Sequence, residues 1–147
     1  MVEQPPFPKD PAALRAFLAE RAQGRLPGLL GIEILELSPG HSRLTLQIDR
    51  RHEAPNGYLH AGSLITLADT ACGFGCLATL PEGASGFTTI EISSNHVATA
   101  LEGRLEAVAT PSHLGRSTQV WDATVTLEPE SRRLALFRCT QMVLYPR

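Results

Sequence analysis

Residues 61–80 read AGSLITLADTACGFGCLATL, and this stretch decides the fold of the chain. It is apolar on most faces and lacks the alternation of a β-strand, so it predicts a buried helix at about 61–79. Turn signals bracket this helix, Pro55-Asn56-Gly57 before it and Pro81-Glu82-Gly83 after it. A helix with so little polar surface must be covered on every side by other elements.

The segments on either side of this helix have the alternation of strands. Two antiparallel strands are expected between Gly31 and Ile48, and their alternation slips between Ile34 and Leu35, which a β-bulge would explain. Four further strands are expected near 86–98, 102–112, 116–128 and 132–146. The sequence therefore predicts an α+β fold in which six antiparallel strands wrap around the central helix.

A shorter helix is predicted near the N-terminus. Asp10-Pro11 is a good N-cap and first-turn pair, and Leu14, Phe17 and Leu18 then recur on one face. This pattern predicts an amphipathic helix over about 11–23, preceded by a loosely held arm, residues 1–10. No repeat or linker divides the sequence, so residues 1–147 are expected to form a single domain.

Composition excludes several classes of function. The chain has 13 Lys+Arg against 15 Asp+Glu, so no global field draws nucleic acid or an anionic membrane. The N-terminus does not resemble a signal peptide, and three cysteines without disulfide-like spacing favour a reducing compartment, so we expect a cytosolic protein. Cys72 and Cys76 share a helix face without nearby His or acidic ligands, so core packing is expected there and no metal.

Asp69 is the anomaly in the central helix. Its neighbours are apolar, and no Lys or Arg lies within one helical turn. A carboxylate buried without a partner is costly, or it stays neutral through a raised pKa. Two interpretations remain open: the hydroxyls of Thr66 and Thr70 satisfy Asp69, or the carboxylate is kept for function.

The N-terminus of the same helix supplies a second functional element. The backbone N–H groups of Ala61, Gly62 and Ser63 have no partner within the helix and lie at the positive end of its dipole. A carbonyl oxygen that becomes an oxyanion would be stabilised there. Asn56 and His60 border this corner.

Helix geometry separates these two elements. Asp69 lies ~12 Å along the axis from Ala61, so one helix cannot present both to a single carbonyl carbon. If both act on one substrate, the carboxylate must come from a second copy of the helix across a two-fold axis. The sequence thus predicts a homodimer that the site requires. A homotetramer is the expected further assembly, although the sequence does not decide between a dimer and a dimer of dimers.

The motifs around this helix resemble a known family. HAG at 60–62 followed by LADTA at 67–71 resembles the His-Gly-Gly…Leu-Ala-Asp-Thr-Ala signature of hotdog-fold acyl-CoA thioesterases. The resemblance continues through GFTTIEI at 86–92 and HLGR at 113–116 and is strongest to the phenylacetate-pathway and 4-hydroxybenzoyl-CoA thioesterases. It implies a hotdog fold and an acyl-CoA substrate, with CoA entering as part of the substrate and no separate cofactor.

The resemblance also implies roles for residues. Asp69 becomes the nucleophile or the general base, the Ala61 N–H becomes the oxyanion donor, and Thr89 lies near the attacking carboxylate. Arg116 is suited to a phosphate because its guanidinium is a fixed fork of donors. Contacts to the CoA nucleotide are implied for His96, Val97, Ala98, His113, Gly115 and Arg116.

Several positions depart from the family pattern. Ala61 stands where the motif has Gly, Ala54 where relatives often have Gln or Asn, and Ala98 where an Arg is common. Asn56 either substitutes for the missing amide or only forms the turn. The change at Ala98 implies that CoA is bound more weakly or in a different way.

Two other classes of function are compatible with parts of this sequence. A hydratase usually needs a His and an acid placed together, but His60 precedes the helix, so an orienting or helix-entry role is favoured for it. Trp121 is expected to pack within a strand. The remaining alternative is a non-catalytic hotdog dimer that binds acyl-CoA, and the sequence leaves the acyl group open.

Overall fold

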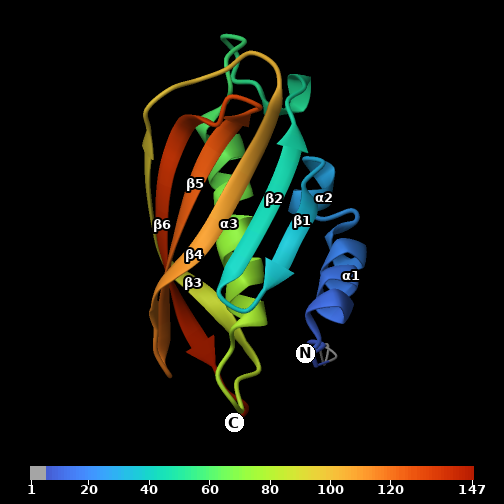
Figure 1. Cartoon of the computed structure of the whole chain (residues 1–147), viewed down its shortest axis with the longest axis vertical. Helices are drawn as coiled ribbons and strands as arrows, with labels where there is room; N and C mark the ends of the chain where they lie inside the picture. Colours follow the sequence, from blue (N-terminus) through green and yellow to red (C-terminus); the bar gives the residue numbers. More distant parts are fainter. Residues whose placement is uncertain (1–5) are drawn as a thin grey trace.

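Six antiparallel strands curl around one long helix in the computed structural model, which describes residues 6–147 (Figure 1). The strand order in the sheet is β1-β2-β4-β5-β6-β3, so β1 and β3 are its two edges. The helices are α1 (Pro11–Ala22), α2 (Leu26–Leu29) and α3 (Ala61–Ala78). The strands are β1 (Glu33–Ser38), β2 (His41–Gln47), β3 (Gly86–His96), β4 (Arg104–Leu114), β5 (Thr118–Glu128) and β6 (Arg132–Leu144).

The structure confirms the predicted order of elements, the central helix and the bulge in the first strand. The register of β1 against β2 shifts between Ile34 and Glu36, so Leu35 is the additional residue. Two elements were missed, α2 and a 3-10 turn at Arg50–His52, because neither is long enough to show a hydrophobic period.

The predicted ends of two strands are wrong. Pro111 predicts the boundary of a strand at 102–112, but β4 runs on to Leu114 and its register shifts between Pro111 and His113. Pro111 is opposite Trp121 and His113 is opposite Val120, so Ser112 is the additional residue. Proline is tolerated beside such a bulge, where the ladder of hydrogen bonds is interrupted. The hairpin turn falls at Gly115, whose N–H donates to the Thr118 carbonyl at 2.9 Å, so β5 begins at Thr118 instead of 116.

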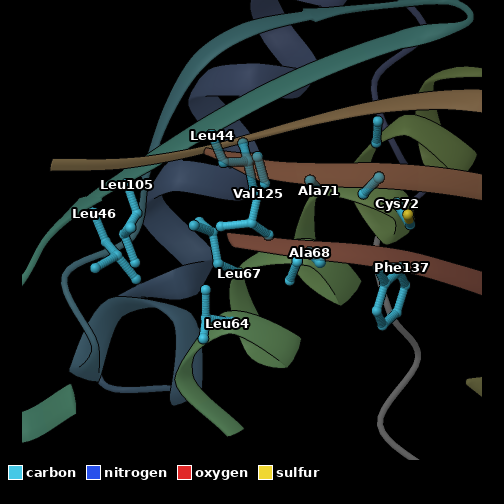
Figure 2. Packing of buried hydrophobic residues seen from close by; sticks show 14 of the residues in the cluster. Leu44, Leu46, Leu64, Leu67, Ala68, Ala71, Cys72, Leu105, Val125 and Phe137 are labelled. Atoms are coloured by element: carbon cyan, nitrogen blue, oxygen red, sulfur yellow. The ribbon is translucent and has the colours of Figure 1, made fainter. Parts of the chain in front are cut away.

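The main core lies between α3 and the concave face of the sheet. Figure 2 shows side chains of α3 and of the strands meeting in this layer. Its buried members include Leu44, Leu46, Leu64, Leu67, Ala68, Ala71, Cys72, Leu105, Val125 and Phe137. A second, smaller cluster joins α1 to β1 through Leu14, Leu18 and Leu37. Helix α3 is long and apolar enough to cross a membrane, but here it is the core helix of the sheet.

Helix α1 forms as its sequence predicts. The Asp10 carboxylate accepts a hydrogen bond from the Ala13 N–H at 2.9 Å, as an N-cap should. Within the predicted arm, Phe7 packs edge-to-face on Phe17 with ring centroids 5.8 Å apart. Residues 1–5 of that arm lie outside the described residues.

Helix α3 approaches the sheet closely at Gly75, which gives a stability prediction. A Cβ on Gly75 would lie 2.6 Å from Cζ3 of the fully buried Trp121. We expect Gly75→Ala to lower the free energy of unfolding by about 1–3 kcal/mol through overpacking, despite the better helix propensity of alanine.

The matched control for this prediction is Gly73→Ala in the same helix. Its Cβ would meet only the end of the half-buried Phe87 ring, at 3.0 Å, so a shift of that ring by a few tenths of an ångström would relieve the contact. Urea titration of both variants tests the prediction. Equal stability of the two variants would show that contact with Trp121 does not limit the site.

The two edges of the sheet differ. Helix α1 packs beside β1, and Arg15 donates to the Ile34 carbonyl at 2.7 Å, so the β1 edge is covered (Figure 1). No strand or helix among residues 6–147 pairs with the free edge of β3. Ile90 and Ile92 on β3 are 52% and 44% exposed. A long free edge that exposes two isoleucines is a template for pairing with another chain.

Candidate active site

The sheet covers only part of α3, contrary to the expectation that the helix is covered on every side. A stripe with Gly62, Thr66, Asp69 and Thr70 remains only partly buried. These residues recur at helical spacing, so they share one face. The candidate site is therefore an open face of the central helix, and Asp69 lies on it.

Asp69 has no local partner. Its Oδ1 atom is buried and accepts no hydrogen bond from the residues that the structure describes. The Thr66 hydroxyl, which was considered as a partner, donates instead to the Gly62 carbonyl at 2.8 Å. Burial raises the pKa of Asp69 above its ordinary value of 3.8. The carboxylate is thus more basic than an ordinary aspartate, as a proton acceptor needs to be.

His60 is the N-cap of α3. Its Nδ1 accepts a hydrogen bond from the Gly62 N–H at 2.8 Å, and its carbonyl accepts from the Ser63 N–H at 2.9 Å. His60 therefore has the helix-entry role that the sequence favoured. The N–H groups of Gly62 and Ser63 are therefore both occupied by His60. The N–H of Ala61 makes no hydrogen bond to the described residues and is the one left for an oxyanion.

A buried histidine that the sequence analysis missed anchors this corner. His52 is fully buried, and its two ring nitrogens bond to the Asp49 N–H at 2.9 Å and the Leu30 carbonyl at 2.7 Å. The carbonyl of His52 accepts from the Ser63 hydroxyl and from the His60 N–H, both at 2.9 Å. The signal that would have found it is the capping-box spacing of Asp49 and His52.

Asn56 serves the turn before α3. Its side-chain oxygen accepts from the Tyr58 N–H at 3.1 Å, and Gly57 between them has φ +85°. This is an Asx turn, in which the side chain replaces a backbone acceptor. In this chain Asn56 is exposed and its amide nitrogen makes no hydrogen bond to the described residues.

The path of β3 along α3 indicates that Thr89 lies at the level of the helical turn that carries Asp69. The Phe87 ring touches the position of Gly73, which is one helical turn beyond Asp69. Strand β3 runs back along α3 in the opposite direction, so moving from Phe87 to Thr89 leads toward Asp69 (Figure 1). The step from Phe87 to Thr89 is ~7 Å along the strand, and the step from Gly73 to Asp69 is ~6 Å along the helix. The Thr89 hydroxyl donates to Oε1 of Gln141 at 2.7 Å.

The residues expected at the CoA nucleotide fall into two groups. The first group begins at His96, which pairs with Ala135 of β6. The second group is in the turn with His113, Gly115 and Arg116, next to Thr118, and Thr118 pairs with Met142 of β6. Seven residues of β6 separate these pairs, so the two groups lie ~23 Å apart within one chain. One chain cannot bring both groups to a single nucleotide.

The side chains in these groups are accessible. His96, Val97, His113 and Arg116 are exposed, while Ala98 and Gly115 are half-buried. The Arg116 guanidinium lies 5.8 Å from the centre of the Tyr145 ring, and the Tyr145 hydroxyl donates to the Arg116 carbonyl at 2.6 Å. The aromatic contact orients Arg116 without using its hydrogen-bond donors.

The cysteines and Trp121 pack in the core, as predicted. Cys72, Cys76 and Cys139 are free and fully buried. A hydrogen bond with Cys139 and burial raise the pKa of the Cys72 thiol, and burial raises that of Cys76 to about 12, so neither is a ready nucleophile. The Trp121 Nε1–H donates to Gln119 Oε1 at 2.8 Å. Residues 6–147 contain no group of three or more His, Cys, Asp and Glu side chains that could hold a metal ion.

Comparison with known proteins gives a consistent result. The thioesterase superfamily matches residues 56–132. The 1,4-dihydroxy-2-naphthoyl-CoA hydrolase of Listeria monocytogenes is 35% identical over 111 residues, 76% of this chain and 89% of the relative. The proofreading thioesterase EntH of Cronobacter turicensis is 31% identical over 121 residues, 82% of this chain and 87% of the relative.

A solved structure has the same fold. A thioesterase of Haemophilus influenzae superposes with a TM-score of 0.82 and 30% sequence identity, covering 89% of this chain and 90% of that one. The six-stranded sheet around α3 is thus the hotdog thioesterase fold. The chain belongs to the thioesterase superfamily and is a thioester hydrolase.

Proposed function

We propose that this protein hydrolyses an acyl-CoA thioester to a free acid and CoA. Asp69 of one subunit serves as general base or nucleophile, and the N–H of the partner subunit's Ala61 stabilises the oxyanion. The observation that carries the proposal is the buried Asp69 Oδ1 without a partner, on an open face of α3. A carboxylate is rarely kept in this state for packing, because burial without compensation is costly.

The proposed active form is a homodimer. Within one chain, Ala61 lies too far along α3 to act with Asp69 on one carbonyl. The free β3 edge and the partly covered face of α3 adjoin each other, so a second copy pairing along β3 would cover both. Val108, Leu136 and Met142 remain exposed on the outer face of the sheet, which supports a homotetramer as the further assembly.

The same pairing explains the separation of the two nucleotide groups. If two copies of β3 pair antiparallel, the His96 end of one strand meets the Gly86 end of the other, next to the turn with Arg116. His96, Val97 and Ala98 would then approach the CoA nucleotide from one subunit and His113, Gly115 and Arg116 from the partner. The proposal therefore assigns each nucleotide to both chains.

The proposed acyl group is aromatic. The Listeria relative is, by its name, a hydrolase of an aromatic acyl-CoA, 1,4-dihydroxy-2-naphthoyl-CoA. The motif resemblance to phenylacetate-pathway and 4-hydroxybenzoyl-CoA thioesterases agrees with this class. The three free, buried thiols support a place in the cytosol, a reducing compartment.

A substrate panel tests the proposal. Phenylacetyl-CoA, 4-hydroxybenzoyl-CoA and 1,4-dihydroxy-2-naphthoyl-CoA are compared with hexanoyl- and octanoyl-CoA, and released CoA is detected with a thiol reagent. We expect the aromatic substrates to have the higher kcat/KM. Faster hydrolysis of the aliphatic esters would contradict the aromatic assignment, and tight binding without hydrolysis of any of them would favour an acyl-CoA-binding dimer.

A further inference from the structure

A buried glutamine, Gln141, accepts a hydrogen bond from Thr89. Gln141 on β6 is directly opposite Thr89 on β3 and is fully buried. Its Oε1 accepts the Thr89 hydroxyl at 2.7 Å, and its Nε2 donates to Cys139 Sγ at 3.3 Å. Both ends of the amide are therefore occupied, which fixes the orientation of the side chain.

This contact decides what Thr89 can offer to a ligand. A threonine hydroxyl has one hydrogen and two lone pairs, and here the hydrogen is committed to Gln141. Thr89 can thus accept a hydrogen bond from a ligand but cannot donate one. It also cannot donate to Asp69, whose Oδ1 remains without a donor.

Two acceptors therefore come from neighbouring elements of the site. The Asp69 side chain is on the open face of α3, with its Oδ1 buried and without a donor among the described residues, and the path of β3 along α3 brings Thr89 to the level of that helical turn. A molecule that donates two hydrogen bonds and keeps a lone pair for attack satisfies both acceptors. Water has this arrangement.

We propose that Gln141 is a positioning residue for thioester hydrolysis. By taking the Thr89 hydrogen, it turns a Thr89 lone pair toward the attacking water, which donates its other hydrogen to Asp69. This inference rests on the proposed role of Asp69 and selects general-base catalysis over covalent attack by the carboxylate.

The bond changes in this step balance. The water oxygen forms a bond to the thioester carbon, the proton facing Asp69 passes to the carboxylate, and the carbonyl π pair moves to oxygen. The oxyanion then re-forms the carbonyl, the C–S bond breaks, and the CoA thiolate takes the proton back from Asp69. Thr89 keeps its own hydrogen on Gln141 throughout.

The test is a double-mutant cycle between Thr89→Val and Gln141→Leu in the full-length protein. We expect Gln141→Leu to lower kcat about tenfold, the effect of one hydrogen bond, with KM unchanged, since Gln141 is buried behind Thr89. The freed Thr89 hydrogen can then bond to the Asp69 carboxylate, so the acid limb of the pH profile of kcat should move to lower pH. In the Thr89→Val background, Gln141→Leu should have no further effect, and Thr89→Ser should keep nearly full activity.

The matched control is Gln119→Leu. Gln119 is equally buried on β5 and pairs across the strand with Gln141. Among residues 6–147, its side chain bonds the Thr79 carbonyl and Trp121 and no other group. It should lose thermal stability while its pH profile stays unchanged. The inference would be overturned if Gln141→Leu lowered kcat equally in the natural and the Thr89→Val backgrounds. It would also be overturned if Gln141→Leu left the acid limb of the pH profile of kcat where it is.

Assaying Asp69→Asn in parallel separates two kinds of failure. An inactive Asp69→Asn together with an undisturbed Gln141→Leu would refute only the role of Gln141. An active Asp69→Asn would refute the base itself, and the inference about Gln141 with it.

Discussion

Replacing Asp69 by Asn is expected to lower kcat for acyl-CoA hydrolysis by about 10²–10⁴-fold, the usual contribution of a general base. Asparagine has nearly the same shape but cannot accept the proton of water. KM should change little, because the carboxylate acts on the reacting atoms and not on the nucleotide. Thiol release measured with the best substrate of the panel tests this, and undiminished turnover would refute the role of Asp69.

Loss of fold is not expected to explain this result, because Asp69→Asn should be more stable than the natural chain at neutral pH. Burial raises the pKa of Asp69 in the folded chain above 3.8, the ordinary value that holds in the unfolded chain. At pH values between 3.8 and the raised pKa, the folded chain therefore binds more protons than the unfolded one. Stability conferred by the protonated carboxyl is then lost as pH rises through the raised pKa. Thermal unfolding should show the variant to be more stable at pH 7, with the difference disappearing below about pH 3.8.

Mixing two inactive variants is expected to restore activity. Ala61→Pro removes the proposed oxyanion donor, and Pro is tolerated at the first helical position. His60 before it already has the extended backbone that a residue preceding proline needs, φ −71° and ψ 132°. Alone, Ala61→Pro should lose about 10²–10³-fold in kcat.

A dimer of Ala61→Pro and Asp69→Asn subunits contains one intact site, because Asp69 of the first subunit meets the Ala61 N–H of the second. After co-refolding of equal amounts, roughly half of the dimers are mixed, so about a quarter of the natural activity should return. Mixing without subunit exchange is the control. If the mixture stays as inactive as its parts, the two groups do not act across subunits.

The sequence predicted the parts of the fold that follow from hydrophobic period. The apolar run at 61–80 gave the central helix, and the slip between Ile34 and Leu35 gave the bulge. Pro111 gives a false strand end, since a proline inside a strand looks like its end unless the bulge is known. Helix α2 was missed because one helical turn has no period of its own.

The candidate site divides in the same way. Asp69 could be found from sequence, because a carboxylate without a local cation is visible in the residues around it. Gln141 could not, because its partner Thr89 lies 52 residues away and the contact exists only once β3 and β6 pair. His60 could be placed at the helix entry, but only the structure shows that it occupies the Gly62 N–H and leaves that of Ala61 available.

The difference between the two edges of the sheet limits how many copies can join through strands. Among residues 6–147, α1 and Arg15 block one edge of the sheet and no element covers the other, so each chain offers one edge for strand addition. Two such chains consume each other's free edge, and no template remains for a third. Helix α1 thus prevents strand addition at the β1 edge. A variant in which α1 is detached would expose a second edge, and such chains could add to one another as a polymer instead of stopping at the dimer.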